Sequence, residues 1–112
     1  MIKPLFLGAT LLCLAGMVLA DADAGLAVIQ DIGRLNGQAL ACGQMAASGQ
    51  AKTLMIKHAP KTRRYGEAFE EATNTGFLAQ GKALDSCPSA AAVADQLTVL
   101  GARLRAALPT PQ

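Results

Sequence analysis

The 112 residues carry a formal charge of only +2, and aromatic side chains make up 4% of the sequence. This balance lacks the strongly basic footprint of a nucleic-acid-binding protein, and it supplies few rings on which bases could stack. The length fits one small domain whose hydrophobic core is marginal by itself. We therefore expect a single domain with no nucleic-acid partner.

Residues 1–20 have the composition of a signal peptide. Lys3 provides a positive start, a long apolar run follows, and Ala20 offers a small residue before a cleavage site, with Ala22 as the alternative site. The run is shorter than the about 20 apolar residues that span a bilayer, which disfavours an uncleaved anchor. The sequence predicts a mature domain over 21–112, located in the periplasm or secreted, without stable membrane insertion.

Two cysteines remain in the mature chain, Cys42 and Cys87. In an exported protein such a pair predicts a disulfide. The chain-entropy model gives about 4 kcal/mol of stabilisation for a loop of this length. A reactive or metal-bound pair is the alternative, although neither a CxxC motif nor a nearby histidine accompanies these cysteines.

The first predicted helix covers residues 24–47. Apolar residues spaced by three and four line one of its faces: Val28, Ile32, Leu35, Ala39, Cys42 and Ala46. Its interior also holds Gly33, Gly37 and Gly43, each of which costs about 1 kcal/mol relative to alanine in a helix. We expect a neighbouring segment to pack closely against these glycines. Ser48–Gly49 is the predicted end of the helix.

Two shorter helices follow in the sequence. One is predicted over 50–58 and ends before Pro60, because proline removes a helical hydrogen bond and disfavours helix in the residue before it. The next is predicted over 61–73, with 74–76 as its stop. Phe77, together with the leucine after it, is then expected to pack back onto the core.

The last predicted helix begins at Cys87–Pro88, where proline suits the first turn. Its apolar stripe consists of Val93, Leu97, Leu100, Leu104 and Ala107. A short disordered, proline-containing tail is predicted over 109–112. Together these patterns predict an all-α fold, a small disulfide-stapled helical bundle of about four helices.

No motif in the sequence predicts catalysis. His58 is the one histidine, and GxSxG, HExxH and Walker-type loops are absent from the sequence. Two of the three carboxylates Glu67, Glu70 and Glu71 could form an acid–base pair, but all three belong to the expected exposed side of a helix. An enzyme is therefore the third interpretation, and no cofactor is expected.

A copper site is the second interpretation. Met45, Met55 and His58 are the only methionine and histidine residues after the leader, and they fall within one short segment. Thioether and imidazole groups suit copper, which exported proteins handle. The competing explanation is that the methionines fill the core and that His58 occupies a helix boundary.

A basic run followed by an acidic run forms the candidate protein-binding face. Its residues are Lys57, Lys61, Arg63, Arg64, Glu67, Glu70 and Glu71. One interpretation is a solvated helix surface with local ion pairs such as Arg63 with Glu67, while Tyr65 and Phe69 point inward. The other is a dipolar face that docks an acidic protein or an anionic surface.

In size, expected export, paired cysteines and helical character, the chain resembles periplasmic acid-stress chaperones and small helical immunity proteins. The resemblance is one of class and involves no shared motif. The sequence favours a non-enzymatic module that binds another exported protein, as a chaperone, inhibitor, immunity factor or accessory subunit. A homodimer is the other partner considered.

Overall fold

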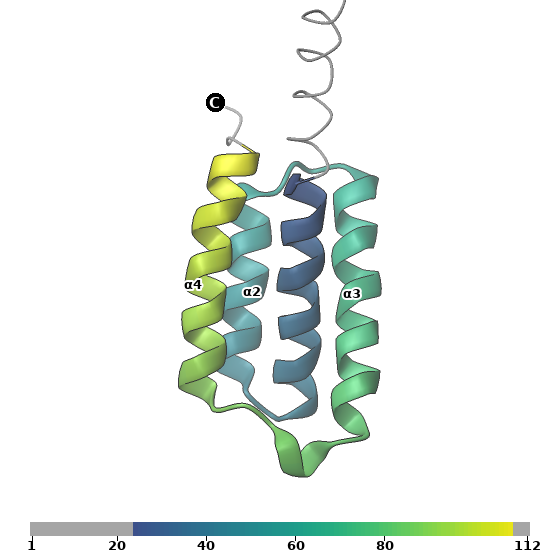
Figure 1. Cartoon of the computed structure of the whole chain (residues 1–112). Coiled ribbons are helices and arrows are strands. Elements are labelled where there is room, and N and C mark those ends of the chain that lie inside the picture. The colour runs from purple at the N-terminus through teal and green to yellow at the C-terminus, as the bar shows by residue number, and fades with distance from the viewer. Residues whose placement is uncertain (1–23, 109–112) are drawn as a thin grey trace, which may run out of the picture.

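The structure is a computed structural model that describes residues 24–108. The predicted signal peptide over 1–20 and the predicted tail over 109–112 lie outside the described residues. Within the described part every regular element is helical, and successive helices run in opposite directions (Figure 1). The predicted fold class, an all-α disulfide-stapled bundle of about four helices, is confirmed.

The described elements follow one another with short connections. The first helix covers residues 24–41, and it is followed by α2 (Met45–His58), α3 (Arg63–Gly81), the 3₁₀ turn η1 (Leu84–Ser86) and α4 (Ala90–Ala107). None of the described helices is long and apolar enough to cross a membrane.

The first helix is the central element of the bundle. In Figure 1 it lies between α2 and α3. Ile29, Ile32 and Ala39 are completely buried on one side of the helix, and Gly37, on another side, is buried as well. A helix that is buried on several sides must contact more than one neighbour. The predicted apolar face is therefore present, and the helix is also buried beyond that face.

α4 supplies the second half of the core. Val93, Leu97 and Leu104 are fully buried, and Leu100 is 8% exposed, as the apolar stripe predicts. This stripe packs against α2 as well as the first helix. Burial of each such side chain contributes about 1.5–3 kcal/mol before the entropy cost of ordering. The predicted stripe is thus the main apolar contribution of the C-terminal half.

The first helix ends earlier than the sequence predicts. Its C-terminus is a Schellman motif in which Gly43 has a positive φ of 69°. The Gly43 amide donates to the Leu40 carbonyl at 3.3 Å, and the Gln44 amide donates to the Ala39 carbonyl at 2.7 Å. The predicted end at Ser48–Gly49 is wrong. Gly43 is therefore a turn residue and not a helix-interior packing site.

α2 consequently begins at Met45, five residues before the predicted start, and includes the Ser48–Gly49 pair. Its predicted end is confirmed, since the last helical residue is His58. Ser48 is 1% exposed and belongs to the core side of α2. Serine ordinarily favours helix ends, but the buried hydrogen bond of Ser48 to Asn36 retains it within α2.

α3 continues through the predicted stop at 74–76, which is therefore wrong. Gly76 sits against the backbone of Arg34 on the first helix, so a residue that favours helix ends is retained for close packing. Phe77 and Leu78 belong to the same helix and are 45% and 56% exposed. The expectation that they pack back onto the core is also wrong.

α4 begins at Ala90 rather than at Cys87–Pro88. The Ser89 side chain caps it by accepting a 3.1 Å hydrogen bond from the Ala92 amide. Such a cap contributes about 1 kcal/mol to helix stability. Proline therefore precedes the cap instead of occupying the first turn.

Candidate functional site

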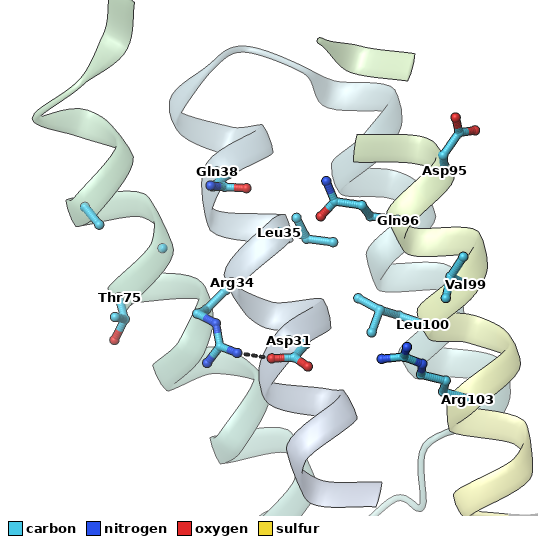
Figure 2. Close-up of a pocket in the computed structure, with 12 residues that line it drawn as sticks. Asp31, Arg34, Leu35, Gln38, Thr75, Asp95, Gln96, Val99, Leu100 and Arg103 are labelled. Atoms are coloured by element: carbon cyan, nitrogen blue, oxygen red, sulfur yellow. Dashed lines mark hydrogen bonds and ion pairs between the residues drawn. The ribbon is translucent and has the colours of Figure 1, made fainter. Parts of the chain in front are cut away.

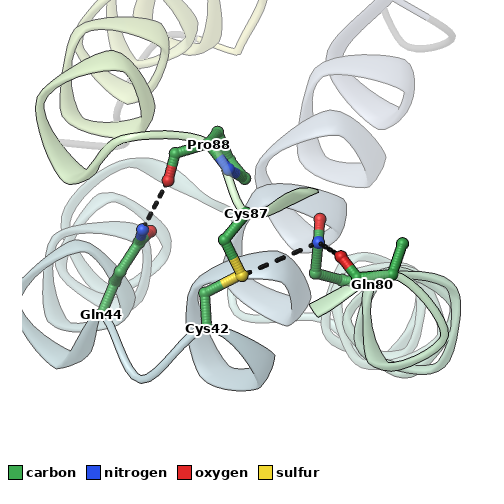
Figure 3. Close-up of a disulfide and its surroundings, with 6 residues drawn as sticks. Cys42, Gln44, Gln80, Cys87 and Pro88 are labelled. Atoms are coloured by element: carbon green, nitrogen blue, oxygen red, sulfur yellow. Dashed lines mark hydrogen bonds between the residues drawn. A yellow bond between two sulfur atoms is a disulfide. The ribbon is translucent and has the colours of Figure 1, made fainter. Parts of the chain in front are cut away.

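The predicted disulfide is present between Cys42 and Cys87, with the two Cα atoms 6.0 Å apart. It joins the end of the first helix to the segment before α4 (Figure 3). Two glutamines support this region. Gln44 Nε2 donates to the Pro88 carbonyl at 2.7 Å, and Gln80 Nε2 donates to the Ala83 carbonyl at 2.7 Å. The arrangement is that of a structural cross-link at one end of the bundle.

The first helix and α3 touch through a glycine seam, which consists of Gly33, Gly37 and Gly76. A Cβ atom on Gly33 would lie 2.7 Å from the Phe69 carbonyl oxygen. One on Gly37 would meet the Thr73 carbonyl oxygen and lie 2.9 Å from the Gly76 carbonyl carbon. Close packing at Gly33 and Gly37 is thus confirmed, and the seam holds α3 directly against the first helix.

A chain of polar side chains crosses the core from α2 through the first helix to α3. Ser48 Oγ donates to Asn36 Oδ1 at 2.7 Å, and Asn36 Nδ2 donates to Thr73 Oγ1 at 3.2 Å. These bonds satisfy the buried amide that would otherwise destabilise the core. This network is not predictable from the sequence, because its members come from three helices and a single asparagine such as Asn36 forms no recognisable pattern.

The position of α3 leaves a groove between α3 and α4, with the first helix as its floor (Figure 2). We call it the α3–α4 groove, and its volume is about 660 Å³. Its lining residues are Asp31, Arg34, Leu35, Gln38, Thr75, Gly76, Ala79, Asp95, Gln96, Val99, Leu100 and Arg103.

The α3–α4 groove combines an apolar centre with a charged rim. Leu35 on the first helix and Leu100 on α4 are almost buried at the base of the groove, whereas Val99 on the α4 wall is 53% exposed. Where the first helix contributes to the rim, Arg34 forms an ion pair with Asp31 (Figure 2). Both of these side chains are about half exposed, so the pair contributes little to stability.

The groove is not predictable from the sequence, because its walls come from segments that are far apart in the chain. The one trace of it in the sequence is Val99, which falls between Leu97 and Leu100 but outside the buried stripe. An exposed valine alone is unremarkable on a protein surface. Val99 can be recognised as part of a binding groove only from the structure, which shows the open space beside it.

The residues of the candidate protein-binding face do not all lie together in the structure. Arg63, Arg64, Glu67 and Glu71 line a shallow hollow of about 440 Å³ between α3 and the first helix. Arg63 Nε lies 3.6 Å from Glu67 Oε1, and both side chains are largely exposed, at 88% and 60%. Exposed pairs of this kind are weak and screened by salt. Glu70 is exposed as well, outside the lining of that hollow.

The two lysines of this face have different surroundings. Lys57 is exposed in the last turn of α2. Lys61 folds back onto the C-terminus of α2, where its Nζ donates to the carbonyl oxygens of Met55 at 3.0 Å and Ala59 at 3.2 Å, and also to that of Ile56. Its charge therefore caps a helix end, where cations are favourable.

The three proposed copper ligands do not meet at one place. Met45 and Met55 are ten residues apart on α2, which corresponds to about 15 Å along the helix axis. Met55 packs against the core, and His58 is half-buried with its Nδ1 lacking a hydrogen-bond partner among the described residues. A site here would contain Met55 and His58 without Met45. In residues 24–108, histidine, cysteine and acidic side chains form no cluster of three that could hold a metal ion.

The chain matches no protein-family model, and no curated protein or solved structure matches it. The geometry of its own residues is therefore the basis on which a function is assigned.

Proposed function

We propose that this chain is a small exported, non-enzymatic module that binds another protein through the α3–α4 groove, as a chaperone, inhibitor, immunity factor or accessory subunit does. The observation that carries the proposal is the exposure of Val99 beside the nearly buried Leu100 in an open groove. Apolar side chains at the centre of a polar-rimmed surface are typical of protein-binding sites.

The occupant that fits is an amphipathic helix of the partner. The groove is bounded by helices, and a further helix would cover it as helices cover one another in a bundle. Apolar side chains of that helix would contact Val99 and Leu100. Charge then sets its direction, because Asp95 favours a basic group and Arg103, further along α4, favours an acidic one.

Site-specific photo-crosslinking tests this function. A benzophenone amino acid replaces Val99 in the groove or Glu70 on the exposed side of α3, and the chain is irradiated in the exporting cell. We expect an adduct with a different protein from position 99 and none from position 70. Digestion of the adduct should locate the crosslink in a helical segment of the partner. Adducts that form only from position 70 would contradict the groove and favour the charged face.

Export is tested separately by the N-terminus of the purified protein. Cleavage after Ala20 predicts a mature chain that starts at Asp21, recovered from the periplasm or the medium. Deletion of residues 2–20 should leave the protein in the cytoplasm with its cysteines reduced. An intact N-terminal segment on the protein recovered from cells would contradict this part of the proposal.

A further inference from the structure

The exposed face of α4 is arranged symmetrically about Val99. Asp95 and Arg103 lie four residues before and four residues after it, and all three line the α3–α4 groove. Spacings of four place side chains on the same side of a helix, about 6 Å apart along its axis. The face therefore has an apolar centre with an acid on one side and a base at equal distance on the other.

This pattern is complementary to itself. When two identical helices pack antiparallel about a two-fold axis, each residue opposes the one at equal distance on the other side of the axis. With the axis at Val99, the two valines meet at the centre. Asp95 of each copy then faces Arg103 of the other, which gives two ion pairs of opposite charge.

The flanking positions also permit this approach. Ala92 and Ala106 are each seven residues from Val99 and would face one another, and Ala102 would face Gln96. All four are exposed. Small side chains allow helix axes to approach to the lower end of the usual 8–10 Å range. No pair of like charges opposes itself along this stretch.

We propose that a second copy of this chain covers the α3–α4 groove, with the two α4 helices antiparallel and Val99 at the two-fold axis. The inference rests on the proposed function in one respect, that the groove is a protein-binding surface. The second copy occupies it when no partner is bound. Dimer formation and partner binding therefore compete for the same residues.

Charge reversal gives a test that few other arrangements would pass. In the mature chain, Asp95→Arg makes positions 95 and 103 both basic, and Arg103→Asp makes both of them acidic. Each variant therefore repels its own copy. Sedimentation equilibrium should show a dimer for the wild type at about 100 µM and at least about tenfold weaker association for each variant. An equimolar mixture of the two variants should recover dimers, because basic positions then face acidic ones.

The controls use charged residues outside this face. Asp85→Arg in η1 and Lys52→Asp on α2 change the net charge by the same amounts and should leave the dimer intact. Circular dichroism of every variant establishes that the helices are retained. A monomeric wild type, or variants whose mixture remains monomeric, would overturn the second copy as occupant.

The two experiments distinguish failure of the dimer from failure of the proposed function. If the wild type is monomeric but still crosslinks a different protein from position 99, the groove binds a partner and only the dimer is refuted. If the dimer forms and position 99 crosslinks only a second copy, the dimer stands and the proposed partner does not. In the case that both hold, adding the partner should convert dimers to heterocomplexes.

Discussion

The Ser48 hydroxyl on α2 donates a 2.7 Å hydrogen bond to the side-chain oxygen of Asn36 on the first helix, and both residues are almost fully buried. Ser48→Ala removes the donor and leaves Asn36 Oδ1 without it. We expect a loss of about 1–3 kcal/mol in the free energy of unfolding, because a buried acceptor then lacks its bond. Urea denaturation measures the loss. Ser86→Ala, at an exposed position, is the matched control and should have little effect.

The glycine seam makes a second prediction. Gly37→Ala places a Cβ against the Thr73 carbonyl oxygen and the backbone of Gly76, which can move only if α3 shifts. We expect destabilisation of about 1–3 kcal/mol, typical of overpacking. Gly49→Ala serves as the control, because nothing lies within 4 Å of the added atom. There the substitution should stabilise α2 by up to about 1 kcal/mol through helix propensity. Equal melting temperatures for the two variants would contradict the seam.

These two sites mark what the sequence could predict and what it could not. The stripe that includes Leu97 and Leu104 was recognisable because period alone identifies a buried helix face. Gly37 was recognisable as a close contact, since a helix rarely retains glycine without a use for it. The residues that they contact on other helices could not be predicted, because pairing between helices depends on tertiary packing.

Packing between helices also explains why two helix boundaries are predicted wrongly. Ser48–Gly49 and Gly76 favour helix ends locally, yet all three lie inside helices. Ser48 is retained by its bond to Asn36, and Gly76 by contact with the first helix. The actual turn at Gly43 carries the same residue type without a distinguishing local pattern. The α3–α4 groove was beyond sequence analysis because it arises from the placement of three helices.

The disulfide makes a third prediction. Cys42 and Cys87 are 45 positions apart in the sequence. Cys42→Ser should lower the stability by about 4 kcal/mol if the loss of loop-closure entropy in the unfolded chain dominates. Thermal denaturation measures it. Reduction of the wild type should lower the melting temperature to that of the variant, and the variant itself should not respond to reductant. An unchanged melting temperature in Cys42→Ser would show that the cross-link contributes nothing.

Lys61 makes a fourth prediction. Its ammonium group donates to carbonyl oxygens at the end of α2, including that of Ala59 at 3.2 Å. Lys61→Met keeps most of the side-chain length and removes the charge. We expect a loss of about 0.5 kcal/mol, reduced further at high salt, because the site is exposed. Lys57→Met, in the last turn of the same helix, is the comparison and should cost less. A binding role for Lys61 would instead appear as lost partner capture with unchanged stability.

The way α3 is attached has a consequence for the motions of the protein. α3 buries only Ala72, Gly76 and Gln80, whereas α4 buries five residues, four of them large and apolar. Segments with few buried apolar contacts open at lower free energy than the rest of a protein. Backbone amides of α3 should therefore exchange with deuterium sooner than those of α4. Since α3 is one wall of the α3–α4 groove, each such opening would widen the groove without disturbing the packing of α2 with α4.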